Sequence, residues 1–190
     1  MSKSFATTES IVLAGGCFWC LEAIFKRLTG VNSVVSGYTG GEIKNPSYET
    51  VSSGTSGHAE AVQVEFSPSV ISLKKILDVF WELHDPTTLN RQGNDIGTQY
   101  RSEIFYTTEA QKQIAEKSLK HIEDIQRYDD QIVTQISKLK AFYPAENYHS
   151  GFYDQNRTHG YCRLVIDPKI KKLYTKFKEN VFHPQTDVKK

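Results

Sequence analysis

Residues 10–28 read SIVLAGGCFWCLEAIFKRL and predict a strand that passes through a glycine turn into a helix. Residues 10–14 form a short apolar run typical of a buried strand, and Gly15-Gly16 interrupts it. From residue 18 to residue 28 apolar side chains recur at helical spacing, until Gly30 ends the pattern. Cys17 is therefore expected at a helix N-terminus, where free backbone N–H groups and the helix dipole favour the thiolate.

Strands and helices interleave along the rest of the chain. Strands are predicted over residues 31–38, 59–66, 101–106, 132–136 and 161–166, and helices over 73–84, 108–127 and 169–177. Ser72 is a plausible N-cap of the first of these helices, and Thr108 with Gln111 makes a capping box for the second. The loops 39–47 and 86–98 are long enough to be candidate walls of an active site.

This order lacks the strict alternation of a doubly wound sheet, so we expect an α+β fold, a mixed-sheet α/β sandwich. The 190 residues, of which 38% are hydrophobic, are enough to bury one core. A single catalytic domain is expected over residues 1–190, with a polar tail at about 183–190.

Charge and termini limit the possible partners. The 23 basic and 22 acidic residues leave no surplus that would favour nucleic acid or an anionic membrane. Residues 1–10 are polar, the apolar run 11–14 is too short for a signal sequence, and no stretch has a spanning length. A cytoplasmic protein is expected.

The three cysteines are an odd number, which argues against a secreted disulfide framework and for chemical roles. Cys17 and Cys20 form a Cys-x-x-Cys pair, typical of a thioredoxin-like dithiol or of half a zinc site. Cys162 stands alone, so a second pair of zinc ligands is missing and no metal is expected. A thioredoxin-like dithiol remains a competing interpretation, although Phe18 and Trp19 place two large rings between the thiols.

Two further functions stay open on these residues. One is a Cys-His hydrolase or transferase, with Cys17 as nucleophile and His58 or His149 as base. His58 has the simpler alternative of a loop residue that bonds to backbone. The other is a redox switch without turnover, built on Cys17 and Cys162.

Several blocks occur in a fixed order along nearly the whole chain: GGCFW at 15–19, SGYTGG at 36–41, NPSY at 45–48, GHAE at 57–60, GNDIGTQYRS at 93–102, FYPAE at 142–146 and GYC at 160–162. They resemble the peptide methionine sulfoxide reductases of the A type. The resemblance implies a ferredoxin-like core, a monomer, and repair of oxidised proteins by reduction of free and peptide-bound methionine S-sulfoxide. It also implies that thioredoxin or another dithiol is the external reductant and that no cofactor is needed.

The resemblance assigns a role to each matching residue. Cys17 would be the nucleophile, and Cys162 would resolve its sulfenic acid through a disulfide, with Cys20 as an alternative resolving thiol. Glu60, enclosed by aromatic rings, would keep its proton to higher pH and act as general acid. The substrate-binding residues would be Phe18 and Trp19 for the methyl group, Tyr48 and Tyr100 with Glu60 for the oxygen, and Asp95 in a supporting place.

Overall fold

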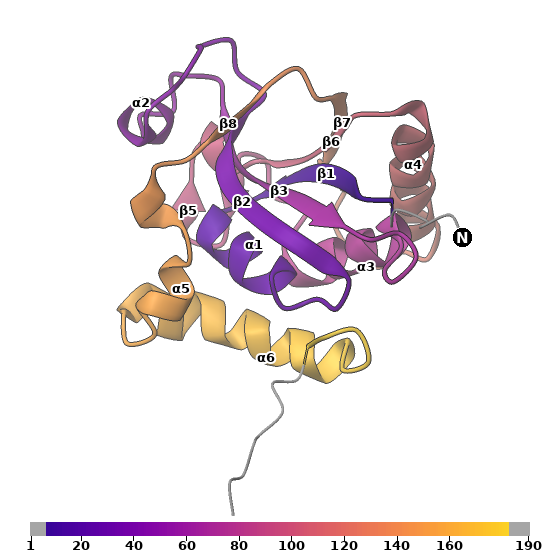
Figure 1. Cartoon of the computed structure of the whole chain (residues 1–190). Coiled ribbons are helices and arrows are strands. Elements are labelled where there is room, and N and C mark those ends of the chain that lie inside the picture. Colours follow the sequence, from indigo (N-terminus) through magenta and orange to yellow (C-terminus); the bar gives the residue numbers. More distant parts are fainter. Residues whose placement is uncertain (1–6, 183–190) are drawn as a thin grey trace, which may run out of the picture.

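The computed structural model describes residues 7–182, which form one six-stranded mixed sheet with helices packed on it (Figure 1). The strands, in the order in which they lie in the sheet, are β7 (Gln135–Lys138), β6 (Ser102–Tyr106), β1 (Glu9–Gly15), β3 (Ala59–Phe66), β2 (Val31–Thr39) and β8 (Phe142–Pro144). β6 and β7 are parallel, and the other neighbours are antiparallel. A small hairpin pairs β4 (Arg91–Gln92) with β5 (Asp95–Ile96).

Six α-helices and three short helical turns complete this part of the chain. The helices are α1 (Phe18–Phe25), α2 (Tyr48–Ser52), α3 (Leu73–Leu83), α4 (Glu109–Asp124), α5 (Phe152–Gln155) and α6 (Asp167–Lys176). The turns are η1 (Thr98–Tyr100), η2 (Asn147–His149) and the π-helical η3 (Cys162–Ile166). The side chains of Ser72 and Thr108 cap α3 and α4, as predicted.

The central elements repeat one unit, β1–α1–β2 and then β3–α3–β6. Their strands lie side by side in the order β6, β1, β3, β2. This is the arrangement of a ferredoxin-like sheet, in which the first strand of each unit takes an inner position. The expected α+β fold with a ferredoxin-like core is confirmed.

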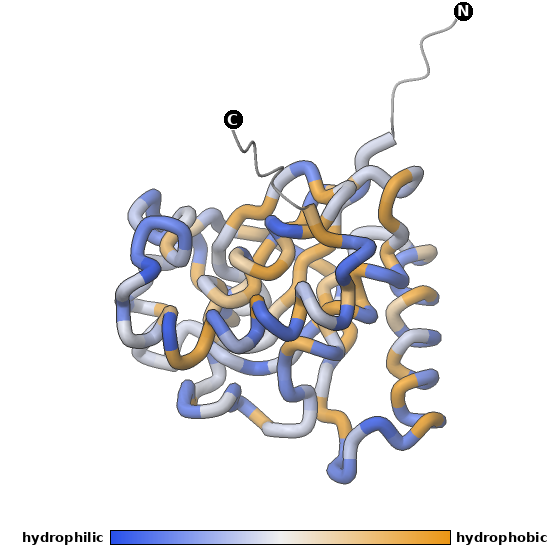
Figure 2. The backbone as a smooth tube through the Cα atoms, turned by 90° about the horizontal axis from the view of Figure 1, so that it is seen from below, coloured by the Kyte–Doolittle hydropathy of each residue, from blue (hydrophilic) through white to orange (hydrophobic). Residues whose placement is uncertain are grey.

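The main core lies between one face of the sheet and the helices. Ile11 and Leu13 of β1 are fully buried in it with side chains of α1 and α3, while Val12 and Ala14 enter a smaller cluster on the opposite face. α6 lies below α1 and contacts both α1 and α3 (Figure 1). Along α4, at the edge of the molecule, hydrophobic and hydrophilic positions alternate (Figure 2).

One predicted strand is wrong. Residues 161–166 form the end of a short helical stretch and η3, which leads directly into α6. Cys162 and Ile166, four residues apart, are fully buried, whereas Leu164 between them is 80% exposed. This burial repeats at a helical and not at a strand period, and a short apolar run does not distinguish the two in advance.

The remaining differences concern boundaries and short elements. The strand expected at 132–136 is β7, which begins later, and α2, α5, β4, β5 and β8 were not predicted. The tail predicted at about 183–190 lies outside the described residues. Within residues 7–182, no helix is long and apolar enough to cross a membrane.

Candidate active site

The predicted site residues converge at one end of the sheet. β1 ends in the glycine turn, where Gly15 pairs with Ser102 of β6. On the other side of β1, Leu13 pairs with Val62 of β3, and β3 continues to Glu60 beside the same turn. The strand register therefore brings together segments that are far apart in sequence.

Cys17 is the N-cap of α1, so the predicted strand, turn and helix are confirmed around it. Its side chain is buried, with 8% exposed. Gly16 has φ +94, and a Cβ atom there would lie 2.5 Å from the Gln92 side chain. Only glycine fits this turn without strain, and the turn determines where the Cys17 sulfur lies.

Glu60 is bound to the backbone directly after the cysteine. The N–H of Phe18 donates a hydrogen bond to Glu60 Oε2 over 3.0 Å, and Glu60 is 1% exposed. Burial raises the pKa of Glu60 to about 8, with a contribution from the Asp95 charge, while hydrogen bonds from Phe18 and Cys17 oppose the shift. The carboxyl group is therefore mostly protonated at neutral pH, in the state that a general acid requires.

The surroundings of Cys17 do not favour the thiolate that was expected from the helix N-terminus. Burial raises the pKa of the Cys17 thiol well above its ordinary value, and the charges on Glu60 and Cys20 add to the rise. Hydrogen bonds from the Trp19 backbone and the Tyr161 hydroxyl lower it by less. Desolvation outweighs the helix N-terminus here, so the resting group is a thiol.

Tyr48 and Tyr100 contribute hydroxyl groups from two different segments, the start of α2 and the end of η1. Burial raises the pKa of both phenols, and the charges on Glu60 and Cys17 raise them further. The charges of Glu60 and Cys17 act on both phenols, so Tyr48, Tyr100, Glu60 and Cys17 lie near one another in one site. The two hydroxyls stay protonated and can donate hydrogen bonds to an oxygen.

Two aromatic side chains follow Cys17, as the sequence requires, but they differ in surroundings. Phe18 is 1% exposed and packs against the rings of Tyr38 and His149. Trp19 is only half-buried and stacks on Phe152 with ring centroids 3.7 Å apart. Trp19 thus offers an indole face at the surface of the site, supported from behind by a residue that sequence reasoning did not identify.

His149 and Glu146 form a second set of contacts that sequence reasoning missed. The indole N–H of Trp19 donates to His149 Nδ1, and Glu146 accepts hydrogen bonds from the Tyr48 backbone and from the Tyr38 hydroxyl. His149 Nε2 lies 3.7 Å from Glu146 Oε2. Glu146 belongs to the FYPAE block, so a signal for it was present in the sequence.

Asp95 interacts with a residue that was not predicted. The Tyr161 hydroxyl donates to Asp95 Oδ2 over 2.6 Å and lies 3.7 Å from Cys20 Sγ. The Tyr161 ring also meets Trp19 edge-on, with centroids 6.0 Å apart. Tyr161 therefore stands between the thiols and the aromatic residues of the site. Tyr161 belongs to the GYC block at residues 160–162, in which the sequence analysis assigned a role to Cys162 alone.

The three cysteines do not meet. Cys17 and Cys20 line one cavity of about 590 Å³, and the Cys20 backbone N–H donates to the Cys17 carbonyl over 3.1 Å. Cys162 is fully buried in η3 and does not line that cavity. The structure thus brings Cys20, and not Cys162, beside Cys17, because Tyr161, directly before η3, lines the cavity while the next side chain, Cys162, enters the core.

His58 has both ring nitrogens engaged with loop backbone. Its Nδ1 accepts from the Gly41 N–H over 3.1 Å, and its Nε2 lies 2.7 Å from the Ile43 carbonyl. The simpler interpretation of His58 as a loop residue is thereby supported. Since His149 Nδ1 is bonded to Trp19, neither histidine has the geometry of a base for a Cys-His hydrolase.

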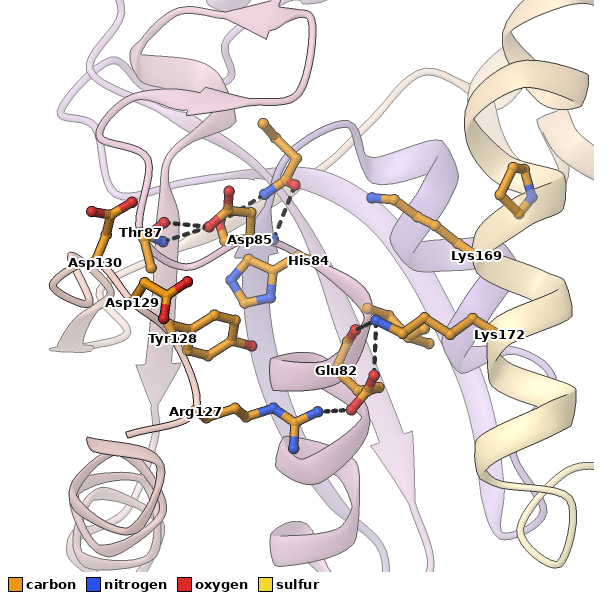
Figure 3. A pocket seen from close by; sticks show the side chains of 13 residues that line it. Glu82, His84, Asp85, Thr87, Arg127, Tyr128, Asp129, Asp130, Lys169 and Lys172 are labelled. Atoms are coloured by element: carbon orange, nitrogen blue, oxygen red, sulfur yellow. Dashed lines mark hydrogen bonds and ion pairs between the residues drawn. The ribbon is translucent and has the colours of Figure 1, made fainter. Parts of the chain in front are cut away.

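A larger cavity, of about 680 Å³, lies next to the site but contains no thiol (Figure 3). The buried carboxylate of Glu82, in its lining, forms ion pairs with Arg127, Lys172 and Lys176. These contacts join α3 to α6 and to the segment after α4. The larger cavity shares Gln92, Pro168 and Lys169 with the cavity that Cys17 and Cys20 line, called here the thiol cavity. The ion pairs of Glu82 mainly connect the elements around the larger cavity.

Across residues 7–182 there is also no cluster of three side chains suited to a metal ion.

Comparisons with known proteins agree with this geometry. The family model described as peptide methionine sulfoxide reductase matches residues 9–181. A relative named peptide methionine sulfoxide reductase MsrA, from Saccharolobus solfataricus, is 52% identical over 91% of this chain and 97% of its own length. Mxr1 from Saccharomyces cerevisiae in its reduced form has a TM-score of 0.75 and 34% identity, over 85% of this chain and 95% of that one. The same yeast protein in complex with Trx2 has a TM-score of 0.53 and 26% identity, over 80% of this chain and 92% of that one.

Proposed function

The chain belongs to the peptide methionine sulfoxide reductase family, and from this premise we propose how its own residues reduce a methionine sulfoxide. The observation that supports the proposal most directly is the buried Glu60, bonded to the backbone next to Cys17, with its pKa raised to about 8. Reduction of a sulfoxide needs a soft nucleophile for the sulfur and a proton donor for the oxygen. Cys17 and Glu60 are these two groups.

Binding places the sulfoxide between the aromatic residues and the hydroxyl groups. The methyl group rests against Phe18 and Trp19, and the oxygen accepts hydrogen bonds from Tyr48, Tyr100 and Glu60. Asp95 acts through Tyr161, whose hydroxyl it holds. These donors stabilise the negative charge that grows on the oxygen during attack.

The chemical step transfers the oxygen atom to the cysteine. The Cys17 sulfur attacks the sulfoxide sulfur while Glu60 gives its proton to the oxygen, and the proton of the Cys17 thiol replaces the one that Glu60 lost. The sulfur–oxygen bond of the substrate then breaks, methionine leaves, and Cys17 keeps the hydroxyl group as a sulfenic acid. The thiol has been oxidised by two electrons and the sulfoxide reduced by two.

For the resolving thiol, the resemblance and the geometry point to different residues. The resemblance assigns Cys162, which would have to leave the core by unwinding η3. Cys20 lies one turn from Cys17 in the same cavity, and Cys17 is an N-cap with extended backbone rather than a residue inside the helix. We propose that Cys20 attacks first, forming a disulfide with Cys17 and releasing water.

An external dithiol then reduces this disulfide. The structure of the yeast relative with Trx2 supports thioredoxin as that dithiol here. The electrons come from sulfur at every step, so we propose that the enzyme needs no metal or organic cofactor. We further propose that it acts as a cytoplasmic monomer in the repair of oxidised proteins, and that it accepts the S epimer as its family does.

A single-turnover experiment tests the proposal. The pre-reduced enzyme is mixed with a peptide methionine S-sulfoxide and no reductant, and the methionine product and the disulfide are mapped by mass spectrometry. About one equivalent of methionine together with a disulfide on Cys17 is the expected result, and Cys17→Ser should give neither. Acylation of Cys17 by a thioester-forming substrate, without sulfoxide reduction, would instead favour the hydrolase.

A further inference from the structure

The thiol cavity is lined by other residues than those proposed to bind the sulfoxide oxygen. Cys17, Cys20, Asp95 and Tyr161 are in its lining, whereas Glu60, Tyr48 and Tyr100 are not. Cys17 is common to both sets, because its charge acts on Tyr48 and Tyr100. Tyr161 is held at the cavity by its hydrogen bond to Asp95 and its edge contact with Trp19.

The rim of the thiol cavity is partly apolar and unusually exposed. Leu164 on η3 is 80% exposed, although it is a large hydrophobic residue, and Val165 and Pro168 continue the apolar surface along the same segment. Contiguous exposed apolar surface, which these three lining residues form together, is typical of a protein-binding surface. The cavity itself is open enough, at about 590 Å³, to admit a protruding group from a partner.

Basic side chains lie on this rim and next to it. Lys169 lines the cavity, and its charge acts on Cys20. Arg163 is exposed next to Leu164. The carboxylate of Asp95, which also lines the cavity, already accepts a hydrogen bond from Tyr161. A partner with acidic side chains around an apolar contact surface would therefore complement this rim.

We propose that the thiol cavity, with Leu164 at its rim, is the docking face for a protein dithiol of the thioredoxin type. The proposal rests on the proposed function, because only a disulfide formed after sulfoxide reduction requires such a partner. The partner that it requires has an apolar surface around its reactive sulfur and acidic residues at the margin of that surface.

The exchange at this face balances in two steps. A partner thiolate attacks Cys20 Sγ, the bond between Cys20 and Cys17 breaks, and Cys17 leaves as a thiolate that Glu60 can protonate. The second thiol of the partner then attacks the mixed disulfide and releases Cys20. The partner ends as a disulfide, and both cysteines of the enzyme are reduced again.

The test compares Leu164→Glu with a matched control, Val70→Glu. Val70 is 60% exposed and lies in the turn after β3, at the opposite end of the sheet from Glu60. Each protein is assayed in three ways: single-turnover reduction of a peptide S-sulfoxide, turnover with dithiothreitol, and turnover with purified thioredoxin, thioredoxin reductase and NADPH. Leu164→Met serves as the conservative variant.

For Leu164→Glu we expect kcat/KM for thioredoxin to fall about tenfold or more, chiefly through KM, because a hot-spot contact is lost and a charge is introduced. Single-turnover reduction and turnover with dithiothreitol should stay at the wild-type rate, and Leu164→Met should recover most of the thioredoxin activity. Val70→Glu should match the wild type in all three assays.

Three results would overturn the inference. Thioredoxin kinetics within about twofold of the wild type would remove Leu164 from the docking face, since hot-spot losses are larger. An equal fall in the single-turnover rate would mean that the cavity serves the sulfoxide substrate. Wild-type turnover with dithiothreitol but not with thioredoxin would exclude the partner class while leaving the reductase intact. Absence of any sulfoxide reduction by the wild type would contradict the proposed function itself.

Discussion

The indole N–H of Trp19 donates a hydrogen bond to Nδ1 of His149 over 3.1 Å. An acceptor at Nδ1 requires the neutral imidazole with its proton on Nε2, the nitrogen that faces Glu146. Burial lowers the pKa of His149, which favours this neutral form. The Trp19 indole, which we propose as a contact of the substrate methyl group, is therefore held at its N–H by His149 and on its ring face by Phe152.

His149→Leu removes the acceptor and should raise KM for a peptide sulfoxide about tenfold, since an unpaired buried N–H costs about 1–3 kcal/mol. His149→Asn offers an amide oxygen as a replacement acceptor and should restore part of the affinity. Steady-state kinetics with Trp19 fluorescence as a second readout checks both. If the two variants bind the sulfoxide equally well, the hydrogen bond does not position the indole.

The pH dependence of the first turnover follows from Glu60. Its pKa of about 8 is raised, so the protonated, active form predominates below pH 8 and is lost as the pH rises through that value. The single-turnover rate should therefore fall with an apparent pKa near 8. Stopped-flow measurements between neutral and alkaline pH record this profile. A rate that stays constant through pH 9 would mean that the reaction does not depend on a proton from Glu60.

Glu60→Gln keeps the size of the side chain but cannot transfer a proton. We expect the single-turnover rate to fall about 10²–10⁴-fold, the usual contribution of a general acid, and the alkaline fall to disappear. Glu65→Gln is the matched control, because Glu65 lies exposed on the same strand. Nearly full activity of Glu60→Gln would assign the proton transfer to another group.

The resolving thiol is identified by two single substitutions. Cys20→Ser should complete one turnover and then stop, because the sulfenic acid on Cys17 has no neighbouring thiol. Cys162→Ser should recycle with thioredoxin at close to the wild-type rate. Mass mapping of the oxidised wild type should find the disulfide between Cys17 and Cys20. The opposite pattern would mean that η3 unwinds and that Cys162 performs the resolution, as the resemblance implies.

The ion pairs of Glu82 should matter for stability rather than for chemistry. Its carboxylate is bonded by Lys172 and Lys176 of α6 and by Arg127, and these cations are partly exposed. Glu82→Gln should lower the free energy of unfolding by about 2 kcal/mol, since a nearly buried acceptor loses its charged partners. Urea unfolding measures this change. Glu109→Gln, at an exposed ion pair, is the control and should change stability by less than about 0.5 kcal/mol.

Much of the fold could be predicted, because several helices and strands are marked by a pattern in their own stretch of sequence. Gly15-Gly16 marks the turn before α1, and the alternation in residues 59–66 marks β3 and thereby the strand that positions Glu60. Residues 161–166 could not be assigned in this way, since the apolar run suits either type of element and only packing against α1 and the core decides for a helix.

The proximity of the candidate residues could be predicted, but not their charges or connections. The block matches named Cys17, Glu60, Tyr48 and Tyr100, which lie near one another in the structure, while their roles stay a prediction. Burial of the Cys17 thiol reverses the expected direction of its pKa, and burial is a property of the whole fold. The bond between Trp19 and His149 spans 130 positions, so no local pattern contains it.

The carboxyl group of Glu60 accepts a hydrogen bond from the main-chain N–H of residue 18, whatever side chain that residue carries. A substitution of the Phe18 side chain leaves this N–H in place, and with it the attachment of Glu60 beside Cys17. Proline is the exception, because it has no N–H to donate. The side chain that we propose for methyl binding can thus change without moving the proposed acid, because the backbone fixes the placement of Glu60.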